Sequence, residues 1–180
     1  MNAILSMPSL ELFPSYIDAR REGLVVGAEK QKTKEEIEEI EKNPEKYIVS
    51  LNDQAPGIFT APNGETFDRV PYEKRWLCKG KQLIGVISLR YKLNPFLEKV
   101  GGHIGYGIRP SMARKGYGTL ALNLMMKRAG ELGIEKLLVT CGPDNPASEK
   151  IIIKNGGIYQ DTLENPYNWG PVKRFWVPVS

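Results

Sequence analysis

The stretch Ile108-Arg-Pro-Ser-Met-Ala-Arg-Lys-Gly-Tyr-Gly-Thr119 decides the fold of this chain. In the residues before it, 103–108, large apolar side chains stand at alternate positions, which is typical of a strand. In the residues after it, 119–132, apolar side chains recur mostly at helical spacing, and Gly133 ends the pattern. The spacing therefore predicts a strand, a glycine-bearing turn and a helix.

The two glycines of this turn, Gly116 and Gly118, have two interpretations. Glycine lets the backbone approach a ligand without a Cβ in the way, and the following helix leaves its first N–H groups unpaired at the positive end of its dipole. Such a turn can hold a phosphate or pyrophosphate, and Arg114 and Lys115 add positive charge at its rim. The simpler interpretation is a tight strand-to-helix turn. It is neither a Walker A loop nor a G-x-G-x-x-G dinucleotide fingerprint.

The composition limits the class of protein. A chain of 180 residues, 41% hydrophobic and 26% charged, suits one globular domain over residues 1–180. Its formal charge of +4 fits a polyanionic small ligand, and the basic residues are too interleaved with Glu to favour nucleic acid. Cys78 and Cys141 lack metal-ligand spacing, so we expect no metal and reduced thiols in the cytoplasm. No segment has membrane-spanning length, so we expect no membrane partner.

The patterns along the chain predict an α/β fold with one mixed sheet flanked by helices. In the N-terminal part, the patterns predict an edge strand at 2–7 and a helix at 10–22. A second helix starts with a Thr33/Glu36 capping box, a third helical piece runs through 47–51, and 55–71 is predicted as a loop. In the remainder, the patterns predict a hairpin of 75–79 with 83–91 and a right-handed βαβ crossover over 103–141. A helix over 145–156, starting at Asn145, and two strands at 158–163 and 172–179 follow.

This order resembles the GNAT superfamily of acyl-CoA-dependent N-acetyltransferases. Within it, Gly101-Gly-His-Ile-Gly-Tyr106 and Leu89-Arg-Tyr-Lys-Leu-Asn94 resemble a bacterial subgroup of "predicted acetyltransferases". Two blocks carry the resemblance: the 108–119 stretch, and Asn145-Pro-Ala-Ser followed by Gly156 eleven residues after the Asn. It covers residues 72–180 well and the first 70 residues loosely. The resemblance implies a three-layer α-β-α fold with a mixed, mostly antiparallel sheet, in which the fourth and fifth strands form a splayed parallel pair.

The resemblance also implies cofactor-binding residues. Backbone amides of the turn would hold the pyrophosphate of acetyl-CoA, and they belong to Arg114, Lys115, Gly116, Tyr117, Gly118 and Thr119. The pantetheine arm would pair with the backbone of Tyr106, Gly107 and Ile108, and one of these N–H groups would polarise the thioester carbonyl. Asn145 would contact the same arm. Ser148 would reach the cofactor or its departing thiolate, or would instead cap the helix backbone.

Three positions depart from the family pattern. Ala113 stands where the motif usually opens with Gln or Arg, which is expected to weaken binding at most, because the pyrophosphate contacts come mainly from backbone. Ile152 stands where many relatives have a Tyr acid, and Thr140 where others have a Glu base. Neither usual proton-transfer group carries over to this chain.

His103 is the only histidine, and an ordinary pKa of about 6.5 suits a general base. The alternative is a hydrogen-bonded histidine that shapes the entry to its strand. Glu73 and Glu98 are weaker candidates for the base, more in keeping with surface carboxylates. The candidate acids, which packing explains equally well, are Tyr106, Tyr117 and Tyr159. Candidates for the acceptor pocket and its closure are Trp76, Arg90 and Asn94, and Trp169, Arg174 and Trp176.

The sequence therefore predicts a cytoplasmic N-acetyltransferase that uses acetyl-CoA as co-substrate. It would acetylate a primary amine, of a small molecule or a protein, by direct attack in a ternary complex. The alternative within enzymes is a transferase that uses another acyl-CoA in place of acetyl-CoA, or one whose acceptor is a protein N-terminus. Outside enzymes, it is an acyl-CoA-binding sensor without turnover, which the missing Tyr and Glu favour. Oligomeric state stays open, although homodimers are common in the family.

Overall fold

A computed structural model describes residues 2–167 and 170–179. Contacts divide the chain into two compact units, each of which is described by itself. The first unit comprises the described residues of Met1–Asp53, Glu73–Ser88 and Gly105–Leu124. The second comprises those of Gln54–Tyr72, Leu89–Ile104 and Met125–Ser180. No helix within the described ranges is both long and apolar enough to cross a membrane.

A four-stranded sheet forms the centre of the first unit. Its strands lie in the order β1-β4-β5-β6, and their bounds are Ile4–Ser6, Tyr72–Lys79, Gln82–Arg90 and Ile104–Ile108. β1 runs antiparallel to β4, with Leu5 opposite Leu77. The structure thus confirms the predicted edge strand and the predicted hairpin, whose turn at residues 80–81 joins β4 to β5.

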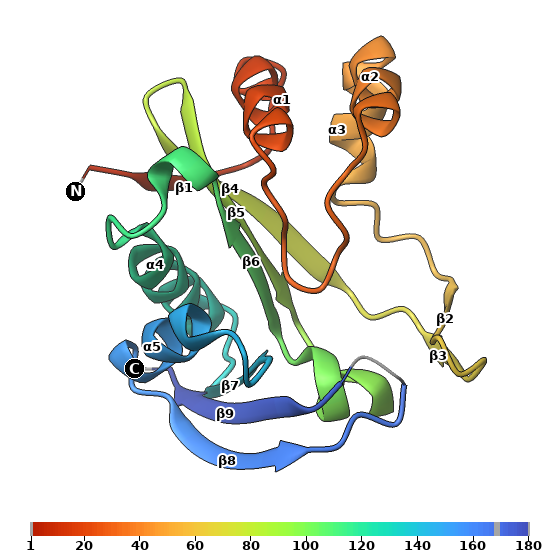
Figure 1. Cartoon of the computed structure of the whole chain (residues 1–180), viewed down its shortest axis with the longest axis vertical. Helices are drawn as coiled ribbons and strands as arrows, with labels where there is room; N and C mark the ends of the chain where they lie inside the picture. The colour runs from red at the N-terminus through yellow and green to blue at the C-terminus, as the bar shows by residue number, and fades with distance from the viewer. Residues whose placement is uncertain (1, 168–169, 180) are drawn as a thin grey trace. The chain divides into compact units, whose positions relative to one another are not determined.

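Three helices of the first unit follow β1 in the chain. They are α1 (Phe13–Arg21), α2 (Lys34–Lys42) and α3 (Pro44–Ser50), and α1 and α2 lie side by side (Figure 1). The capping box is confirmed: Thr33 N–H donates to Glu36 Oε2 over 2.8 Å, and Glu36 N–H donates to Thr33 Oγ1 over 3.3 Å. α1 begins later than predicted because Leu10–Leu12 form a turn that precedes it.

The apolar faces of these helices pack on β4 and β5. The ring of Tyr16 stacks on Trp76, with the centroids 4.8 Å apart and the planes 7° from parallel, and both side chains are buried. Around this pair the core gathers Leu12, Phe13, Ile17, Ala19, Leu24, Ile37, Leu51, Cys78, Leu83 and Val86. The apolar residues of these helices and strands therefore pack together in one cluster in the first unit.

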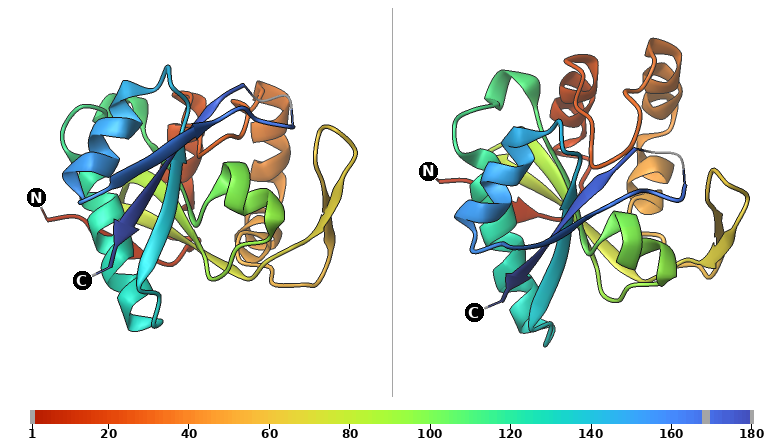
Figure 2. Two further views of the ribbon diagram at one scale, coloured as in Figure 1. Left: turned by 90° about the horizontal axis from the view of Figure 1, so that it is seen from below. Right: turned by 60° about the horizontal axis from the view of Figure 1, so that its bottom comes forward.

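The second unit contains a three-stranded antiparallel sheet in the order β7-β9-β8, which is coloured cyan to dark blue in Figure 2. The bounds are Lys136–Cys141 for β7, Ile158–Leu163 for β8 and Val172–Pro178 for β9. Helix α5 (Pro146–Lys154) joins β7 to β8, and a single π-helical turn (Leu97–Gly101) precedes β6. The predicted strands are confirmed within one residue, and the predicted helix is confirmed with Asn145 as its N-cap and Lys154 as its last residue, two before the predicted end.

The segment 55–71 is not all loop, contrary to the prediction. It contains a hairpin of β2 (Ile58–Thr60) and β3 (Thr66–Asp68) in the second unit. Ala61 N–H donates to Glu65 O over 2.8 Å, and Gly64 closes the turn with φ of 89°. The prolines that suggested a loop lie outside the paired residues, whereas Asn63-Gly64 is itself a hairpin signal. The strands are only three residues long and largely exposed.

Helix α4 (Tyr117–Glu131) connects β6 to β7, so the predicted strand-helix-strand order is confirmed. In place of one mixed sheet the structure has two, and β6 is an edge strand of the four-stranded sheet, whereas β7 is an edge strand of the three-stranded sheet. The residue before β6 nevertheless bonds to β7, because His103 N–H donates to Leu138 O over 2.7 Å.

Candidate functional site

The turn between β6 and α4 lies in the first unit and has an unusual backbone. Pro110–Met112 form one turn of 3-10 helix, and the chain then passes through Arg114 with φ of 59° and Gly116 with φ of 81°. Arg114 is the only residue other than glycine with positive φ in the described ranges. Because side chains rarely adopt this conformation, the surroundings of the turn must hold it in place.

Helix α4 begins without a side-chain cap from the preceding residue. Leu120 N–H donates to Gly116 O over 3.1 Å, so Gly116 stands at the N-cap and has no side chain to accept a hydrogen bond. The amides of Tyr117 and Gly118 precede the first intrahelical donor and have no partner within the helix. The Lys115 ammonium donates to Ser111 O over 3.0 Å at the rim. The turn therefore fits an anion such as a pyrophosphate at the positive end of α4.

The backbone of β6 offers hydrogen-bonding groups on two sides. Arg109 N–H donates to Ile84 O on β5 over 2.8 Å. Because the groups of successive residues alternate in direction, those of Gly107 face β5, and those of Tyr106 and Ile108 face the other side. There, Gly27 N–H donates to Tyr106 O over 3.0 Å. Of the three residues predicted to pair with pantetheine, Tyr106 and Ile108 therefore turn their N–H groups away from β5.

Gly107 has a different reason to lack a side chain. A Cβ built on it would lie 1.8 Å from Val25 O, so the segment before Gly27 crosses the strand in direct contact with its backbone. Sequence reasoning did not foresee this crossing. Glycines at alternate positions of one strand, Gly105 and Gly107, were the signal that could have revealed it, because they mark the close approach of another backbone.

The second sequence block that carries the resemblance, at the start of α5, lies in the second unit. Asn145 Oδ1 accepts a hydrogen bond from Ser148 N–H over 3.0 Å, and Pro146 occupies the first helical position. The helix cap predicted for Asn145 is therefore confirmed, and the side-chain NH2 group is the part of Asn145 outside the cap. The backbone N–H of Ser148 is thus the group that Asn145 caps.

His103 is held by the edge of β7 in the second unit. Its Nδ1 accepts a hydrogen bond from Leu138 N–H over 2.9 Å, and its side chain is 8% exposed. Burial lowers the pKa of His103 to about 4, against the hydrogen bond from Leu138 and with a smaller contribution from Arg90. A neutral imidazole that accepts at Nδ1 carries its proton on Nε2, so neither nitrogen has a lone pair ready for a substrate proton. This geometry favours the alternative role, a histidine that shapes the strand entry.

The other proton-transfer candidates also have structural partners or open exposure. Glu73 is buried and forms a 2.7 Å ion pair with Arg75. The expectation that it is a surface carboxylate was therefore wrong. Glu98 is exposed. The hydroxyl of Tyr159 shares a 2.8 Å hydrogen bond with Thr162. None of these observations places a free acid or base at the turn before α4.

The acceptor-pocket candidates mostly serve the fold. Trp76 is fully buried and cannot line a pocket. In the second unit, Arg90 donates to Gly102 O over 3.1 Å, and Asn94 donates to Asp68 O over 2.8 Å. Arg174 pairs with Asp161, and Trp176 donates to Gln160 over 2.6 Å. Trp169 lies outside the described residues.

Neither thiol is activated. Burial raises the pKa of Cys78 and of Cys141 to about 11 each, so both are protonated near neutral pH. Within residues 2–167 and 170–179, no three His, Cys, Asp or Glu side chains gather closely enough to hold a metal ion.

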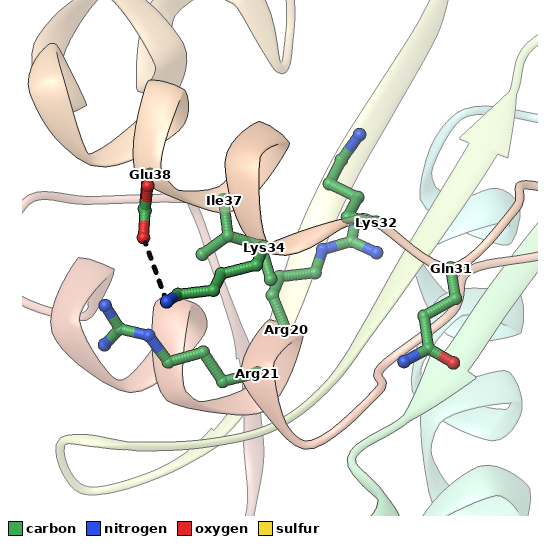
Figure 3. Close-up of a pocket in the computed structure, with 7 residues that line it drawn as sticks. All are labelled: Arg20, Arg21, Gln31, Lys32, Lys34, Ile37 and Glu38. Carbon is green, nitrogen blue, oxygen red and sulfur yellow. Dashed lines mark ion pairs between the residues drawn. The ribbon is translucent and has the colours of Figure 1, made fainter.

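A cavity of about 240 Å³ lies between the end of α1 and the start of α2 (Figure 3). It is lined by Arg20, Arg21, Gln31, Lys32, Lys34, Ile37 and Glu38. Three of its four cations have carboxylate partners: Arg20 pairs with Glu29, Arg21 with Glu41 over 2.6 Å, and Lys34 with Glu38 over 3.7 Å. Because the charges are largely matched, we assign no ligand to this cavity.

The sequence of the chain matches a family model described as the acetyltransferase (GNAT) domain, over residues 31–158. The chain belongs to the GNAT family. It is thus an N-acetyltransferase by family, in agreement with the resemblance drawn from its two sequence blocks. No functionally curated protein matches it in sequence.

Solved structures of GNAT enzymes share the fold at low sequence identity. A chimera of spermidine N-acetyltransferase SpeG from Vibrio cholerae and hSSAT is 15% identical, with a TM-score of 0.62 over 99% of this chain and 96% of that one. RimL, a ribosomal L7/L12 alpha-N-protein acetyltransferase in complex with coenzyme A, is 13% identical, with a TM-score of 0.60 over 98% and 94%. A putative ribosomal-protein-serine acetyltransferase from Vibrio cholerae is 14% identical, with a TM-score of 0.59 over 98% and 93%.

Two of the three departures from the GNAT pattern, Ile152 and Thr140, are structural residues here. Ile152 is fully buried, and a Cβ on Gly157 would lie 2.4 Å from its side chain, so the position belongs to the packed interior of the second unit. Thr140 Oγ1 donates to Val100 O over 3.1 Å. An isoleucine cannot transfer a proton, and this threonine hydroxyl is already committed to the backbone.

Proposed function

We propose that this GNAT enzyme moves the acetyl group of acetyl-CoA to a primary amine by direct attack in a ternary complex. The observation that carries the proposal is the start of the 15-residue helix α4, where Gly116 at the N-cap has no side chain to accept from the amides of Tyr117 and Gly118. A helix start with a glycine at the N-cap, behind a glycine turn, suits the pyrophosphate of a coenzyme A thioester.

In this proposal the backbone of Arg114–Thr119 holds the pyrophosphate, and the side chains of Arg114 and Lys115 contribute charge at the exposed rim. Ile108 N–H, which faces away from β5, pairs with the thioester end and polarises its carbonyl. One such donor is worth a few kcal/mol in a dry site. Asn145 contacts the pantetheine arm through its side-chain NH2, and the Ser148 hydroxyl contributes at the departing thiolate.

Acetyl-CoA supplies an activated acyl group, and the protein does not need a nucleophile of its own. Protonated Cys78 and Cys141, with pKa values near 11, support attack by the acceptor amine itself rather than a covalent acyl-enzyme. The amine must be neutral to attack. Since the Nδ1 lone pair of His103 is engaged by Leu138, we propose that water rather than His103 takes the amine proton.

The acceptor is proposed as a primary amine in agreement with the relatives, which are named for spermidine and for ribosomal protein. A small polyamine and a protein amine are therefore the two kinds of acceptor to test first.

The test measures thermal unfolding of the purified protein with and without acetyl-CoA. A ligand present at about 100 times its Kd and bound only to the folded state adds about 2.7 kcal/mol of stability. Thiol release is then followed with a panel of amines that includes spermidine, amino acids and N-terminal peptides. A shift with thiol release supports the proposal, whereas a shift without release for any amine supports a sensor. No shift at millimolar acetyl-CoA overturns it.

A further inference from the structure

The carboxylate of Glu22, at the end of α1, accepts hydrogen bonds from the turn that precedes the proposed pyrophosphate-binding residues 114–119. Glu22 Oε1 accepts from Arg109 Nε over 2.8 Å and from a second guanidinium nitrogen over 2.5 Å. Glu22 Oε2 accepts from Ser111 Oγ over 2.7 Å and from Ser111 N–H over 3.4 Å. A residue 87 positions earlier in the chain thus fixes both ends of the 109–111 segment, within the first unit.

The same segment is anchored to β5 from its other side. Arg109 N–H donates to Ile84 O over 2.8 Å, and a guanidinium nitrogen of Arg109 donates to Ser15 Oγ over 3.2 Å. Ser15 Oγ in turn accepts from Leu83 N–H over 2.9 Å. Arg109 therefore bridges α1 and β5 at the point where the chain leaves β6.

The ion pair between Glu22 and Arg109 is partly shielded from solvent. The side chain of Arg109 is 11% exposed and that of Glu22 is 31% exposed. The hydrogen bonds from Arg109 and then from Ser111 outweigh desolvation and lower the pKa of Glu22 to about 2, so the carboxylate is charged at any physiological pH. Charge-assisted hydrogen bonds of this kind are about twice as strong as neutral ones.

A negative charge close to a proposed pyrophosphate site would by itself oppose binding. Here Arg109 neutralises it, and the carboxylate serves to hold the turn rather than to meet the ligand. The turn it holds leads directly into Ala113 and the left-handed Arg114, a conformation that needs support from outside.

We propose that Glu22 is a positioning residue for cofactor binding: through Arg109 and Ser111 it keeps the 109–113 turn in the shape that presents the amides of Arg114–Thr119. This inference rests on the proposed function of that loop. A loop that is in its binding shape only a tenth of the time binds about tenfold more weakly. The residue is thus expected to affect affinity for acetyl-CoA and not the chemical step.

The experiment compares Glu22→Ala and Glu22→Gln with the matched control Glu41→Ala. Glu41 also pairs with an arginine of α1, Arg21, over 2.6 Å, and its side chain is 34% exposed, but it does not touch the turn. Calorimetry gives the Kd for acetyl-CoA, and steady-state kinetics give kcat and both KM values. For Glu22→Ala we expect the Kd and the KM for acetyl-CoA to rise about tenfold, with kcat and the amine KM within about twofold. Glu22→Gln is expected to show a smaller rise, and Glu41→Ala no change.

A second measurement needs no ligand. Hydrogen exchange of the backbone amides in the peptide spanning 109–117 should be faster in Glu22→Ala than in wild type, and unchanged in Glu41→Ala. Wild-type affinity and unaltered exchange in Glu22→Ala would overturn the inference while leaving the proposed function intact. Absence of acetyl-CoA binding by the wild type would instead overturn the proposed function and the inference together, and exchange would then report only on the folding role of Glu22.

Discussion

Helices α4 and α5 each follow a strand and a short turn, and their N-termini are completed in different ways. α5 is closed by its own sequence: Asn145 accepts from Ser148 N–H, and Pro146 brings no N–H that needs a partner. α4 starts behind Gly116, which has no side chain with which to accept from the helix. The start of α5 therefore provides its own cap, whereas the start of α4 leaves backbone N–H donors for another partner.

The difference separates a structural helix start from a binding one more clearly than the glycine count does. Both turns contain glycine, and both lie in blocks that match the GNAT pattern. Only the turn before α4 combines a glycine at the N-cap, a left-handed Arg114 and an external support from Glu22. We therefore expect the α4 turn to account for most of the cofactor affinity, and the α5 turn to account mainly for stability.

The largest effect is expected at the strand that leads to α4. Gly107→Ala places a Cβ 1.8 Å from Val25 O, a backbone atom that cannot move alone, and should lower the free energy of unfolding by about 3 kcal/mol or more. Urea unfolding measures the loss. Gly130→Ala is the control, because its Cβ meets only a Val179 methyl group at 3.1 Å and helix propensity favours alanine. Equal stability of the two variants would show that the chain crossing at β6 is not rigid.

The second effect concerns the ligand. Gly118→Trp fills the buried start of α4 and should abolish the acetyl-CoA thermal shift, which amounts to about 2.7 kcal/mol at 100 times the Kd. Differential scanning fluorimetry with a titration of acetyl-CoA measures it. Asn145→Ala, at the other helix start, should retain most of the shift. If both variants lose it equally, the contrast between the two starts fails.

The third effect is a pH dependence at the entry to β7. The pKa of His103 is lowered to about 4 in the folded protein, from about 6.5 when unfolded, so the unfolded state binds the proton first as pH falls. Stability is therefore lost between pH 6.5 and 4, by about 2 kcal/mol at pH 5. In His103→Asn, whose amide oxygen can accept from Leu138 N–H, this loss should vanish and kcat at neutral pH should persist.

Urea unfolding at pH 7.5 and pH 5 measures that effect in the two proteins. A parallel loss in His103→Asn would assign the pH dependence to other groups. A collapse of kcat without a change in stability would instead restore His103 as the general base.

The smallest effect is expected at the α5 cap. Asn145→Ala removes the acceptor for Ser148 N–H and should lower the free energy of unfolding by about 1 kcal/mol. Asn145→Asp keeps an acceptor at the helix start and should recover most of that stability. Thermal unfolding of the three proteins without ligand measures it. An unchanged melting temperature in Asn145→Ala would mean that solvent replaces the cap at no penalty.

Local rules predicted the features whose partners are close in sequence. The Thr33/Glu36 capping box, the Asn145 cap and the strand-turn-helix around Gly116 each involve residues within four positions of one another. The π-helical turn at Leu97–Gly101 and the β2–β3 hairpin were missed, the latter because prolines in the same segment outweighed its Asn-Gly signal.

The features that give the site its shape could not be read in this way. Glu22 meets Arg109 across 87 positions, and Gly27 meets Tyr106 across 79, so nothing in the local sequence pairs them. Similarly, His103 has the composition of a catalytic base, and only the strand edge that engages its Nδ1 indicates otherwise. Residue type suggested the chemistry, and tertiary contacts decided which residues are available for it.

Three consecutive residues at the end of α1 each reach a different neighbour: Arg20 binds Leu24 O and Glu29, Arg21 binds α2, and Glu22 binds the 109–111 turn. Consecutive residues on a helix point about 100° apart, so these directions are fixed by helical phase. Inserting or deleting one residue earlier in α1 would turn all three away together. The three contacts therefore depend together on the length of α1, whereas a substitution at one of these residues removes only its own contact.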